Sequence, residues 1–475
     1  MSHHTLPRRI VLQRVALLVA VLPDALLASC TTATTSSGTR ISTTAAATAA
    51  LRASASSAVT AMPTRAKQVV SYFVSGDAAF IGVYQSAIKT IFNVRTSGDG
   101  WKRDANVQAR VIPVPGSNPM SKLETMIAGG TPPDVAGIAF EGWVPLVAKG
   151  VALNLDGYIN QHPEVNLPDF VAYDIDACTY GGHYYALPRD GGFTEMFYNV
   201  GLFRSAGIPT PTEQVKAGMW NWQNFLVSAE KLTKQSNGRI VQFGTSYGDW
   251  LTWLFSNQAD VLNAEKTAAT LDVPNAIDAL QFIQDLIIKH KVAPTPADLT
   301  AQNLNQLFMT GRLAMTFGFR GVMADYKSIT GFRWDVAPIP TGKVRMAHGT
   351  SGTNYVDAKS KYPAAAFSLL AFICSTEGQI YRMGKQGTGM PSRTSVLDSP
   401  AYLSYKAPMA ASTAIDTVWK AELEAGRART VPGTPQWAEI NTALTKQLGY
   451  LLDGSRNGKE VGQAMTQAVN EILKT

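Results

Sequence analysis

The chain has 475 residues, of which 45% are hydrophobic and 16% charged; 42 Lys and Arg against 35 Asp and Glu give a formal net charge of +7. This length is too great for one ordinary core, so we expect two domains. The basic residues are spread out, with no block beyond isolated pairs, which does not argue for nucleic acid as a partner.

The first thirty residues have the character of an export signal. Arginines at positions 8, 9 and 14 precede an apolar run over 15–21, and the sequence LASC at 27–30 has the form of a bacterial lipobox. We predict a signal peptide over 1–30, lipidation of Cys30 and an exported protein anchored on the extracytoplasmic face of the cell membrane. The alternative is an ordinary signal peptide with a chance cysteine, and the arginine pair leaves both the general and the twin-arginine export routes open.

Residues 31–66 consist almost entirely of Ser, Thr and Ala. Such a segment has little to bury, so we expect it to be disordered. As a flexible tether it would reach roughly 30 Å on average. A folded body held near a membrane in this way suits the capture and delivery of a solute.

The folded part opens with strands and helices in alternation. Strands are expected at 68–74, at 106–114 and from 135 onward, with helices at 81–92 and 120–127 between them. This order predicts a parallel sheet with right-handed crossovers. Ligands of such sheets bind beyond the carboxyl ends of the strands, which places 75–77 and 140–143 on the ligand side.

The stretch 181–211 links this unit to the next one. Two extended segments, 183–187 and 193–199, are separated by Pro188, the charged pair Arg189-Asp190 and two glycines. They could form a surface hairpin or one chain passing between two lobes. We favour the passage, because a complete α/β pattern precedes this stretch and another follows it.

The second half alternates in the same way. Helices are expected at 200–206, 220–233, 250–255 and 274–289 (with Asp272 as a cap), strands at 240–243, 313–317 and 334–339, and two terminal amphipathic helices begin near Trp437 and Val461. Pro- and Gly-rich segments at 338–342 and 387–391 suggest a second and a third passage between lobes.

Several of these segments resemble a known family. They are GGTPPDV (129–135), YALPRDGG (185–192), FYNVGLFRSAGIPTP (197–211), LDVPNAIDALQFIQDLI (271–287), GRLAMTFGFRG (311–321), WDVAPIPTG (334–342) and GTGMPSR (387–393). In this order they resemble family 1 extracellular solute-binding proteins, which are similar to maltose- and other sugar-binding subunits of ATP-driven importers. The resemblance covers nearly everything after residue 67.

The resemblance implies an α/β, two-lobe fold of the periplasmic-binding-protein type II, with three interlobe crossovers and a ligand cleft between the lobes. The N-terminal lobe would comprise 67–192 and 344–389, and the C-terminal lobe 193–343 and 390–475. The chain departs from the family at 257–260, where a Gly-Gly pair is common, and at 349–355. Both departures concern the identity of the solute.

Sugar recognition needs flat apolar surfaces for C–H faces and polar groups that hold hydroxyls. Residues of these types lie at predicted strand ends and crossovers. The candidates for solute contacts are Asp77, Glu141, Trp143, Arg189, Asp190, Trp250, Trp253, Phe319, Arg320, Ser351 and Arg393. We expect about half of them to touch solute, with Trp143, Arg189 and Trp250 favoured. One of Trp250 and Trp253 should be core, Arg189 and Asp190 could brace the hinge, and Phe319 could pack under the sheet.

One segment fits a catalytic motif. GTSYG at 244–248 has the G-x-S-x-G form of a nucleophile elbow around Ser246, between a predicted strand and helix. His290 and His348 are the only downstream histidines, and an HGGG-type oxyanion loop is missing. A secreted serine hydrolase is therefore only the rival hypothesis from another class. The histidines and cysteines show no metal-ligand spacing and no phosphate-binding P-loop occurs, so we expect neither metal nor cofactor.

The sequence therefore predicts a lipid-anchored, monomeric receptor that binds a carbohydrate by hinge closure and delivers it to the permease of an ABC importer, without chemistry on the ligand. A polyamine or a glycerol phosphate is the alternative solute. For an exported protein a Cys178–Cys374 disulfide is one option, and two buried free thiols are the other.

Overall fold

The structure is a computed structural model that describes residues 66–115, 119–385, 387, 389–404, 409–411 and 416–474. The predicted signal peptide, Cys30 and nearly all of the predicted tether lie outside these residues. The chain divides into two units at Thr64, and the second unit, Arg65–Thr475, contains the helices and strands of the fold. None of the helices in the described ranges combines the length and the apolar character needed to cross a bilayer.

The first sheet has five strands in the order β4-β1-β5-β15-β8. Their bounds are β1 Gln68–Ser75, β4 Val107–Val114, β5 Val135–Ala139, β8 Ala186–Asp190 and β15 Gly352–Val356. β1 pairs in parallel with β4 and β5, whereas β15 runs antiparallel to β5 and β8. The predicted parallel β-α-β-α-β unit is confirmed. Its connections are α2 (Ala78–Ala87), which continues as a π-helical turn to Phe92, and α3 (Pro119–Ala128).

The second sheet has three antiparallel strands in the order β12-β9-β13. They are β9 Glu195–Asn199, β12 Met315–Gly318 and β13 Trp334–Ala337. The strand predicted at 240–243 belongs to neither sheet. β11 (Arg239–Gln242) forms a hairpin with β10 (Lys234–Ser236), and only Phe243 bridges to Leu313. Asn237 and Gly238 have φ values of 50° and 74°, which is the Asn-Gly geometry of a tight hairpin turn.

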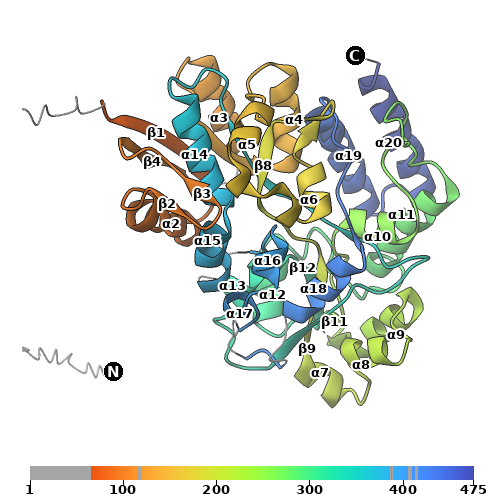
Figure 1. The fold of residues 1–475 in the computed structure, drawn as a ribbon. Coiled ribbons are helices and arrows are strands. Elements are labelled where there is room, and N and C mark those ends of the chain that lie inside the picture. Colours follow the sequence, from red (N-terminus) through yellow and green to blue (C-terminus); the bar gives the residue numbers. More distant parts are fainter. Residues whose placement is uncertain are drawn as a thin grey trace, which may run out of the picture. The chain divides into compact units, whose positions relative to one another are not determined.

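The stretch between β8 and β9 is a crossover and not a hairpin. β8 pairs with β15 of the first sheet, whereas β9 pairs with β12 and β13 of the second (Figure 1). Two other segments run beside it: Gly191 N–H donates to the Met390 carbonyl (3.0 Å), and Thr350 N–H donates to the Gly192 carbonyl (2.8 Å). Two further passages of the chain, at Thr350 and Met390, are therefore each bonded to the first one between the sheets. The exact lobe limits stay a prediction.

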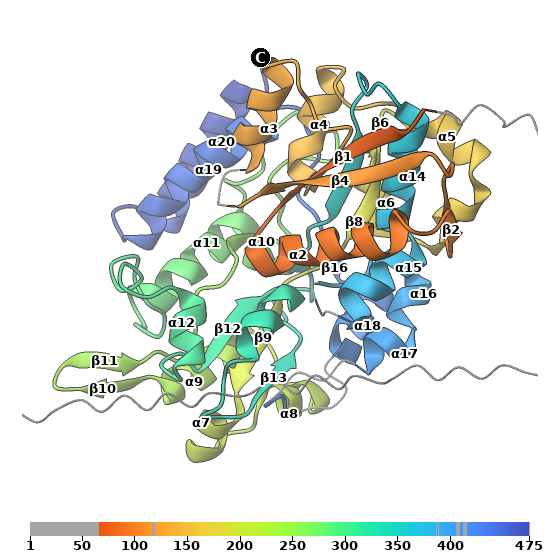
Figure 2. The same cartoon turned by 90° about the vertical axis from the view of Figure 1, so that its left-hand side faces the viewer.

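Helices pack against both sheets. The first sheet carries α14 (Pro363–Cys374), which packs on β15, β8, β1 and β5 and is buried over almost its whole length. The terminal helices α19 (Trp437–Leu452) and α20 (Gly458–Ile472) pack with α11 (Pro274–Ile287), as Figure 2 shows. The predicted cap of α11 is wrong. Val273 stands at the N-cap without a side-chain hydrogen bond, and Pro274 opens the helix.

The remaining elements are short. The helices are α4 Phe140–Ala148, α5 Asp156–Gln161, α6 Ala172–Asp176, α7 Val200–Ser205, α8 Pro211–Lys216, α9 Trp222–Leu232, α10 Trp250–Ser256, α12 Leu304–Met309, α13 Met323–Tyr326, α15 Thr376–Gln379, α16 Thr394–Leu397, α17 Pro400–Leu403 and α18 Asp416–Glu424. The small strands are β2 Ser97–Gly98, β3 Trp101–Lys102, β6 Thr179–Tyr180, β7 His183–Tyr184, β14 Ala347–His348 and β16 Ala428–Arg429.

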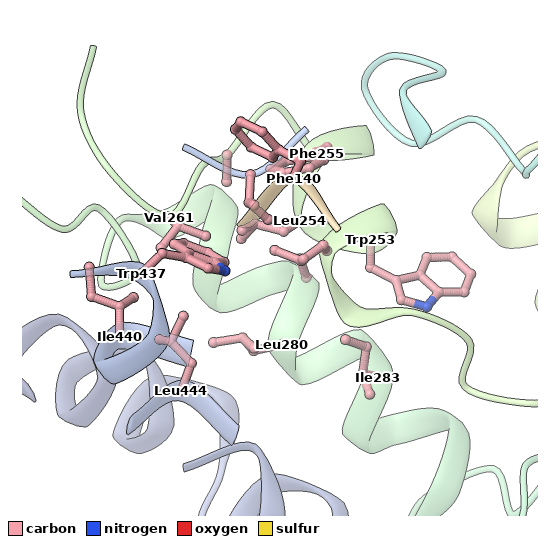
Figure 3. Close-up of a cluster of buried hydrophobic side chains, with 14 of the residues drawn as sticks. Phe140, Trp253, Leu254, Phe255, Val261, Leu280, Ile283, Trp437, Ile440 and Leu444 are labelled. Atoms are coloured by element: carbon pink, nitrogen blue, oxygen red, sulfur yellow. The ribbon is translucent and has the colours of Figure 1, made fainter. Parts of the chain in front are cut away.

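One hydrophobic cluster joins elements from both halves of the chain. Figure 3 shows Ile440 and Leu444 of α19 pointing toward Leu280 of α11, with Phe140 of α4 and Trp437 in the same group. All five side chains are at most 5% exposed. Each large apolar side chain buried in this way contributes about 1.5–3 kcal/mol to folding. This cluster therefore fixes the start of α19 next to the end of β5.

Both cysteines in the described part of the chain, Cys178 and Cys374, are free and buried. Of the two options for this pair, the structure has the free thiols. Burial raises the pKa of the Cys374 thiol to about 11.

Candidate functional site

A cavity of about 480 Å³ lies where the two halves of the chain meet. Its lining residues are Ser75, Pro119, Met120, Gly137, Ile138, Ala139, Gly142, Arg189, Leu251, His348, Val431, Trp437, Ala438 and Asn441. The volume is within the range of small-molecule sites, about 300–1,000 Å³. The cavity is therefore our candidate solute site.

One wall of the cavity consists of strand ends of the first sheet. Ser75 is the last residue of β1, Ala139 is the last of β5, and Arg189 is the last but one of β8. The opposite wall comes from α10, β14 and the start of α19. The carboxyl ends of the parallel strands β1 and β5 face the ligand space, as expected for a sheet of this kind.

A second, larger hollow of about 870 Å³ lies between α4, α6 and the segments around 260–267 and 428–436. It shares Val431 with the first cavity but includes neither Arg189 nor the last residues of β1 and β5. None of the residues predicted to touch solute lines it. The first cavity is therefore the better match to the predicted site.

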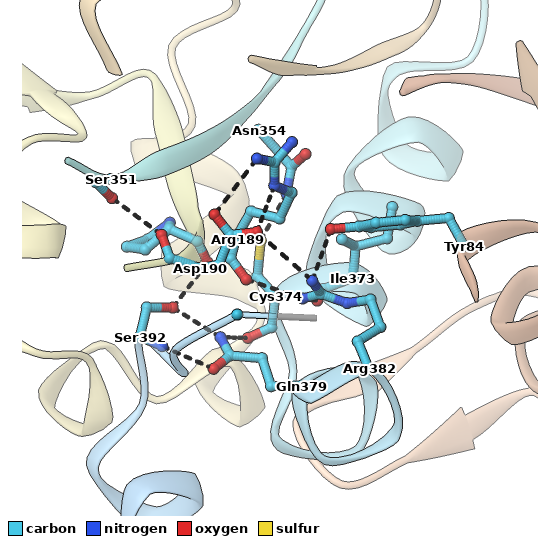
Figure 4. A network of polar contacts seen from close by, with 12 residues as sticks. Tyr84, Arg189, Asp190, Ser351, Asn354, Ile373, Cys374, Gln379, Arg382 and Ser392 are labelled. Atoms are coloured by element: carbon cyan, nitrogen blue, oxygen red, sulfur yellow. Dashed lines mark hydrogen bonds and ion pairs between the residues drawn. The ribbon is translucent and has the colours of Figure 1, made fainter. Parts of the chain in front are cut away.

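Arg189 and Asp190 form the charged centre of the crossover (Figure 4). The Arg189 Nε donates to Asp190 Oδ2 (2.8 Å) and Nη2 donates to Oδ1 (3.3 Å). Arg382 reaches in beside Tyr84: its Nη2 donates to the Arg189 carbonyl (2.8 Å), and its Nη1 donates to the Tyr84 hydroxyl (2.7 Å). The Arg382 Nη1 also lies 3.8 Å from Asp190 Oδ2. The network holds the crossover, and Arg189 faces the cavity from it.

Two groups of this centre have shifted pKa values. Burial lowers the pKa of the Arg189 guanidinium, but Asp190, with Tyr84 and Tyr72, raises it more, so the net pKa lies well above the usual value. Burial raises the pKa of Asp174 well above its usual range; Ser351 lowers it and the Asp190 carboxylate raises it. The arginine therefore stays charged, and the Asp174 carboxyl tends to stay neutral.

His348 and Trp437 are the aromatic side chains of the cavity. The His348 Nδ1 contacts Asp249 Oδ2, and Asp249 in turn caps α10 by accepting from the Leu251 N–H (3.1 Å). Trp437 is 5% exposed and opens α19. The sequence pointed to His348 only as a possible catalytic residue and to Trp437 only as the start of an amphipathic helix. Nothing local marks either as a cavity residue, because the docking of distant segments brings them there.

Four of the predicted contacts are core or structural residues. Trp143 is fully buried, with its Nε1 donating to the Ala177 carbonyl, and Trp253 is 1% exposed in a cluster of aromatic rings. Arg320 binds Asp416, and Arg393 binds Asp169 and two backbone carbonyls. Both arginines are about 1% exposed. All four side chains are buried with internal partners, and none of them is among the residues that line the cavity.

The remaining predicted residues other than Arg189 are not among those that line the cavity. Ser351 is buried, and its hydroxyl donates to the Asp190 carbonyl (3.4 Å). Asp77 is exposed and caps α2 by accepting from the Phe80 N–H (2.8 Å). Trp250 is half-buried next to the lining residue Leu251, Phe319 has its ring centroid 6.2 Å from that of His348, and Glu141 belongs to α4. Of the predicted set, Arg189 alone lines the cavity itself.

The structure gives Ser246 no catalytic setting. Its side chain is completely buried, and its hydroxyl lies 3.4 Å from the Thr316 hydroxyl. His348 bonds to Asp249 and His290 to Glu230. The strand expected before the elbow is the outlying hairpin β10–β11. These contacts do not favour a serine hydrolase.

Comparison with known proteins identifies the family. The family model for bacterial extracellular solute-binding proteins matches residues 93–380, more than half of the chain. The chain belongs to this family. A binding protein of Brucella abortus is 24% identical over 408 residues, covering 84% of this chain and 91% of that protein. The arabinooligosaccharide-binding protein of Halalkalibacterium halodurans is 24% identical over 291 residues, 59% of this chain and 63% of that protein.

The fold is also that of solved solute-binding proteins. The ABC substrate-binding protein Lmo0181 of Listeria monocytogenes, solved with cycloalternan, superposes with a TM-score of 0.75 at 21% identity, over 86% of this chain and 99% of that one. The chain therefore has the two-lobe, type II periplasmic-binding-protein fold, with mixed helices and strands. The predicted family and fold class are confirmed.

Proposed function

We propose that this protein is the receptor of an ABC importer, that it captures a carbohydrate in the cavity between its two halves, and that it delivers the closed complex to a permease. The observation that carries the proposal is the composition of the cavity: strand ends of one sheet face α10 and α19 of the other half. Groups from both sides contact a solute together only when they close on it, so the solute shifts the population toward the closed form.

The chemistry of the lining supports a sugar. Trp437 offers a flat apolar surface, and Ser75, Arg189, His348 and Asn441 offer hydrogen-bonding groups. No Asp or Glu occurs among the described residues that line the cavity, which disfavours a polyamine. The relatives point the same way, since one is named for arabinooligosaccharides and another was solved with cycloalternan.

The proposal keeps the predicted lobes, 67–192 with 344–389 and 193–343 with 390–475. It also keeps the predicted export, the lipid on Cys30 and the monomeric state. Substituting Cys30 by serine should move the protein from the membrane fraction to the soluble fraction. A variant that stays with the membrane would contradict lipid anchoring at Cys30 and leave the receptor function standing.

A thermal-shift screen tests the function itself. The protein is heated with mono-, di- and oligosaccharides, polyols, polyamines and glycerol phosphate. A solute present at about 100 times its Kd adds about 2.7 kcal/mol to stability, which for a protein of this size raises the Tm by several degrees. A shift with one class of sugar supports the proposal. A shift with a polyamine alone would mean that the solute is a polyamine and not a sugar. The absence of a shift with every solute would contradict the receptor function.

A further inference from the structure

The charges around the cavity are unequal. Arg189 contributes a guanidinium to the lining, and the described lining residues include no carboxylate. The Arg189 side chain is 13% exposed and its partner Asp190 is 18% exposed. A guanidinium so far removed from water needs nearby negative charge. A bound solute can supply part of it.

Asp190 is a single carboxylate facing two guanidinium groups. It is bonded to Nε and Nη2 of Arg189, and Nη1 of Arg382 approaches it to 3.8 Å. A second carboxyl group near the crossover belongs to Asp174, and burial raises its pKa, which favours the neutral form. The negative charge beside Arg189 is therefore shared between two cations.

The Arg189 guanidinium also has an edge left for a ligand. Nε and Nη2 are used by Asp190, whereas Nη1 makes no hydrogen bond to the described residues. Gly137 lies beside this edge: a Cβ there would come within 2.9 Å of Nη1, and still closer to the Tyr72 hydroxyl (2.5 Å) and Asn354 Oδ1 (2.8 Å). Gly137 itself lines the cavity. A side chain at Gly137 would therefore crowd Nη1, the donor that Asp190 leaves unused.

We propose that the solute is an acidic sugar, and that its carboxylate or phosphate group binds against Arg189 in the cavity. This rests on the proposed carbohydrate-receptor function and names the class of sugar. Arginine suits both anions, because its planar donors match two oxygens at once. Ser75, His348, Trp437 and Asn441 are then left for the ring and its hydroxyls.

The experiment is a calorimetric titration of the full chain with matched ligands. The acidic probes are D-glucuronate, D-galacturonate, digalacturonate and D-glucose 6-phosphate, and the neutral probes are D-glucose, D-galactose and galactobiose. We expect an acidic probe to bind at least about tenfold more tightly than its neutral parent. The advantage should shrink between about 50 and 300 mM NaCl, because salt screens charge. A preference among the acidic probes separates carboxylate from phosphate.

Substitutions of Arg189 test whether this residue causes the preference for acidic over neutral probes. We expect Arg189→Gln to weaken binding of the acidic probe by at least about tenfold and to change the neutral parent little, and Arg189→Lys to retain part of the preference. Arg429→Gln is the control, because Arg429 lines the other hollow. If Arg189→Gln fails to fold, Arg189→Lys and the salt dependence of the wild type decide.

Two outcomes would overturn the inference. If a neutral sugar binds as tightly as its acidic counterpart, with no effect of salt, the acidic-sugar proposal fails and the carbohydrate receptor stands. If neither neutral nor acidic sugars bind, both proposals fail.

Discussion

The Nε of Arg320 lies 2.5 Å from Oδ1 of Asp416, and its Nη2 lies 3.1 Å from Oδ2, in an ion pair whose side chains are 1% and 2% exposed. The pair connects the turn after β12 to the start of α18. The same arginine donates to the Gly389 carbonyl (2.7 Å), at the third passage between the sheets. Arg320 was a candidate for solute contact. In the structure it bonds the second sheet to Gly389 and to Asp416 of α18.

Removing the charge of Asp416 should therefore destabilise the protein. Asp416→Asn keeps the shape but leaves a buried guanidinium without its counter-charge, and we expect the free energy of unfolding to fall by about 3–5 kcal/mol. Urea unfolding measures it. Glu471→Gln, in the exposed pair with Lys474, is the control and should change stability by less than about 1 kcal/mol. Equal stability of the two variants would contradict a structural role for Arg320.

The first crossover should tolerate no side chain at Gly191. A Cβ there would lie 2.4 Å from Asp174 Oδ2, whereas a Cβ on Gly389, in the neighbouring passage, would meet nothing within 4 Å. We expect Gly191→Ala to lower the free energy of unfolding by about 1–3 kcal/mol through overpacking. Gly389→Ala should have little effect. Urea unfolding of the two variants, side by side, checks this, and similar losses at both positions would refute it.

Stability should depend on pH through Asp174. Its folded-state pKa is raised, so the folded protein keeps a proton that the unfolded chain releases above about pH 4. Stability therefore falls as the pH rises from there toward the folded pKa, by about 1.4 kcal/mol per pH unit for one proton. Asp174→Asn removes this dependence, so its stability relative to wild type should rise with pH over that window.

Unfolding in urea at a series of pH values from 4 to 7 measures the difference in stability between Asp174→Asn and wild type. Asp278→Asn serves as the control, because Asp278 is exposed on α11. A constant difference between Asp174→Asn and wild type across the series would mean that Asp174 titrates normally in the folded protein.

Substitutions of two tryptophans should have different effects, one on the affinity for sugar and the other on the free energy of unfolding. Trp437 lines the cavity, whereas Trp143 is fully buried and is not among the residues that line it. We expect Trp437→Leu to weaken sugar binding at least about tenfold, or about 1.4 kcal/mol. Trp143→Leu should leave the Kd unchanged and lower the free energy of unfolding by about 2–4 kcal/mol. Calorimetry and urea unfolding of both variants measure the two effects, and a large loss of affinity in Trp143→Leu would reverse the assignment.

The architecture was largely readable from the sequence, because strands, helices and turns leave local periodicities. The direction of single side chains was not. Gly142 and Trp143 are neighbours on α4, yet one lines the cavity and the other is core, since successive residues on a helix point about 100° apart. Trp437 joins the site from the far end of the chain. Its position depends on how α19 packs against α11 and α4, which no short segment encodes.

The two buried thiols, Cys178 and Cys374, make this protein suited to fluorescence measurements. Maleimide dyes react with an accessible thiolate, and burial raises the pKa of both thiols. One new cysteine on the exposed face of α3 and another on that of α9 would therefore be labelled against little background in a Cys30→Ser protein. Energy transfer between the two dyes would then test whether the two halves close when a sugar is added.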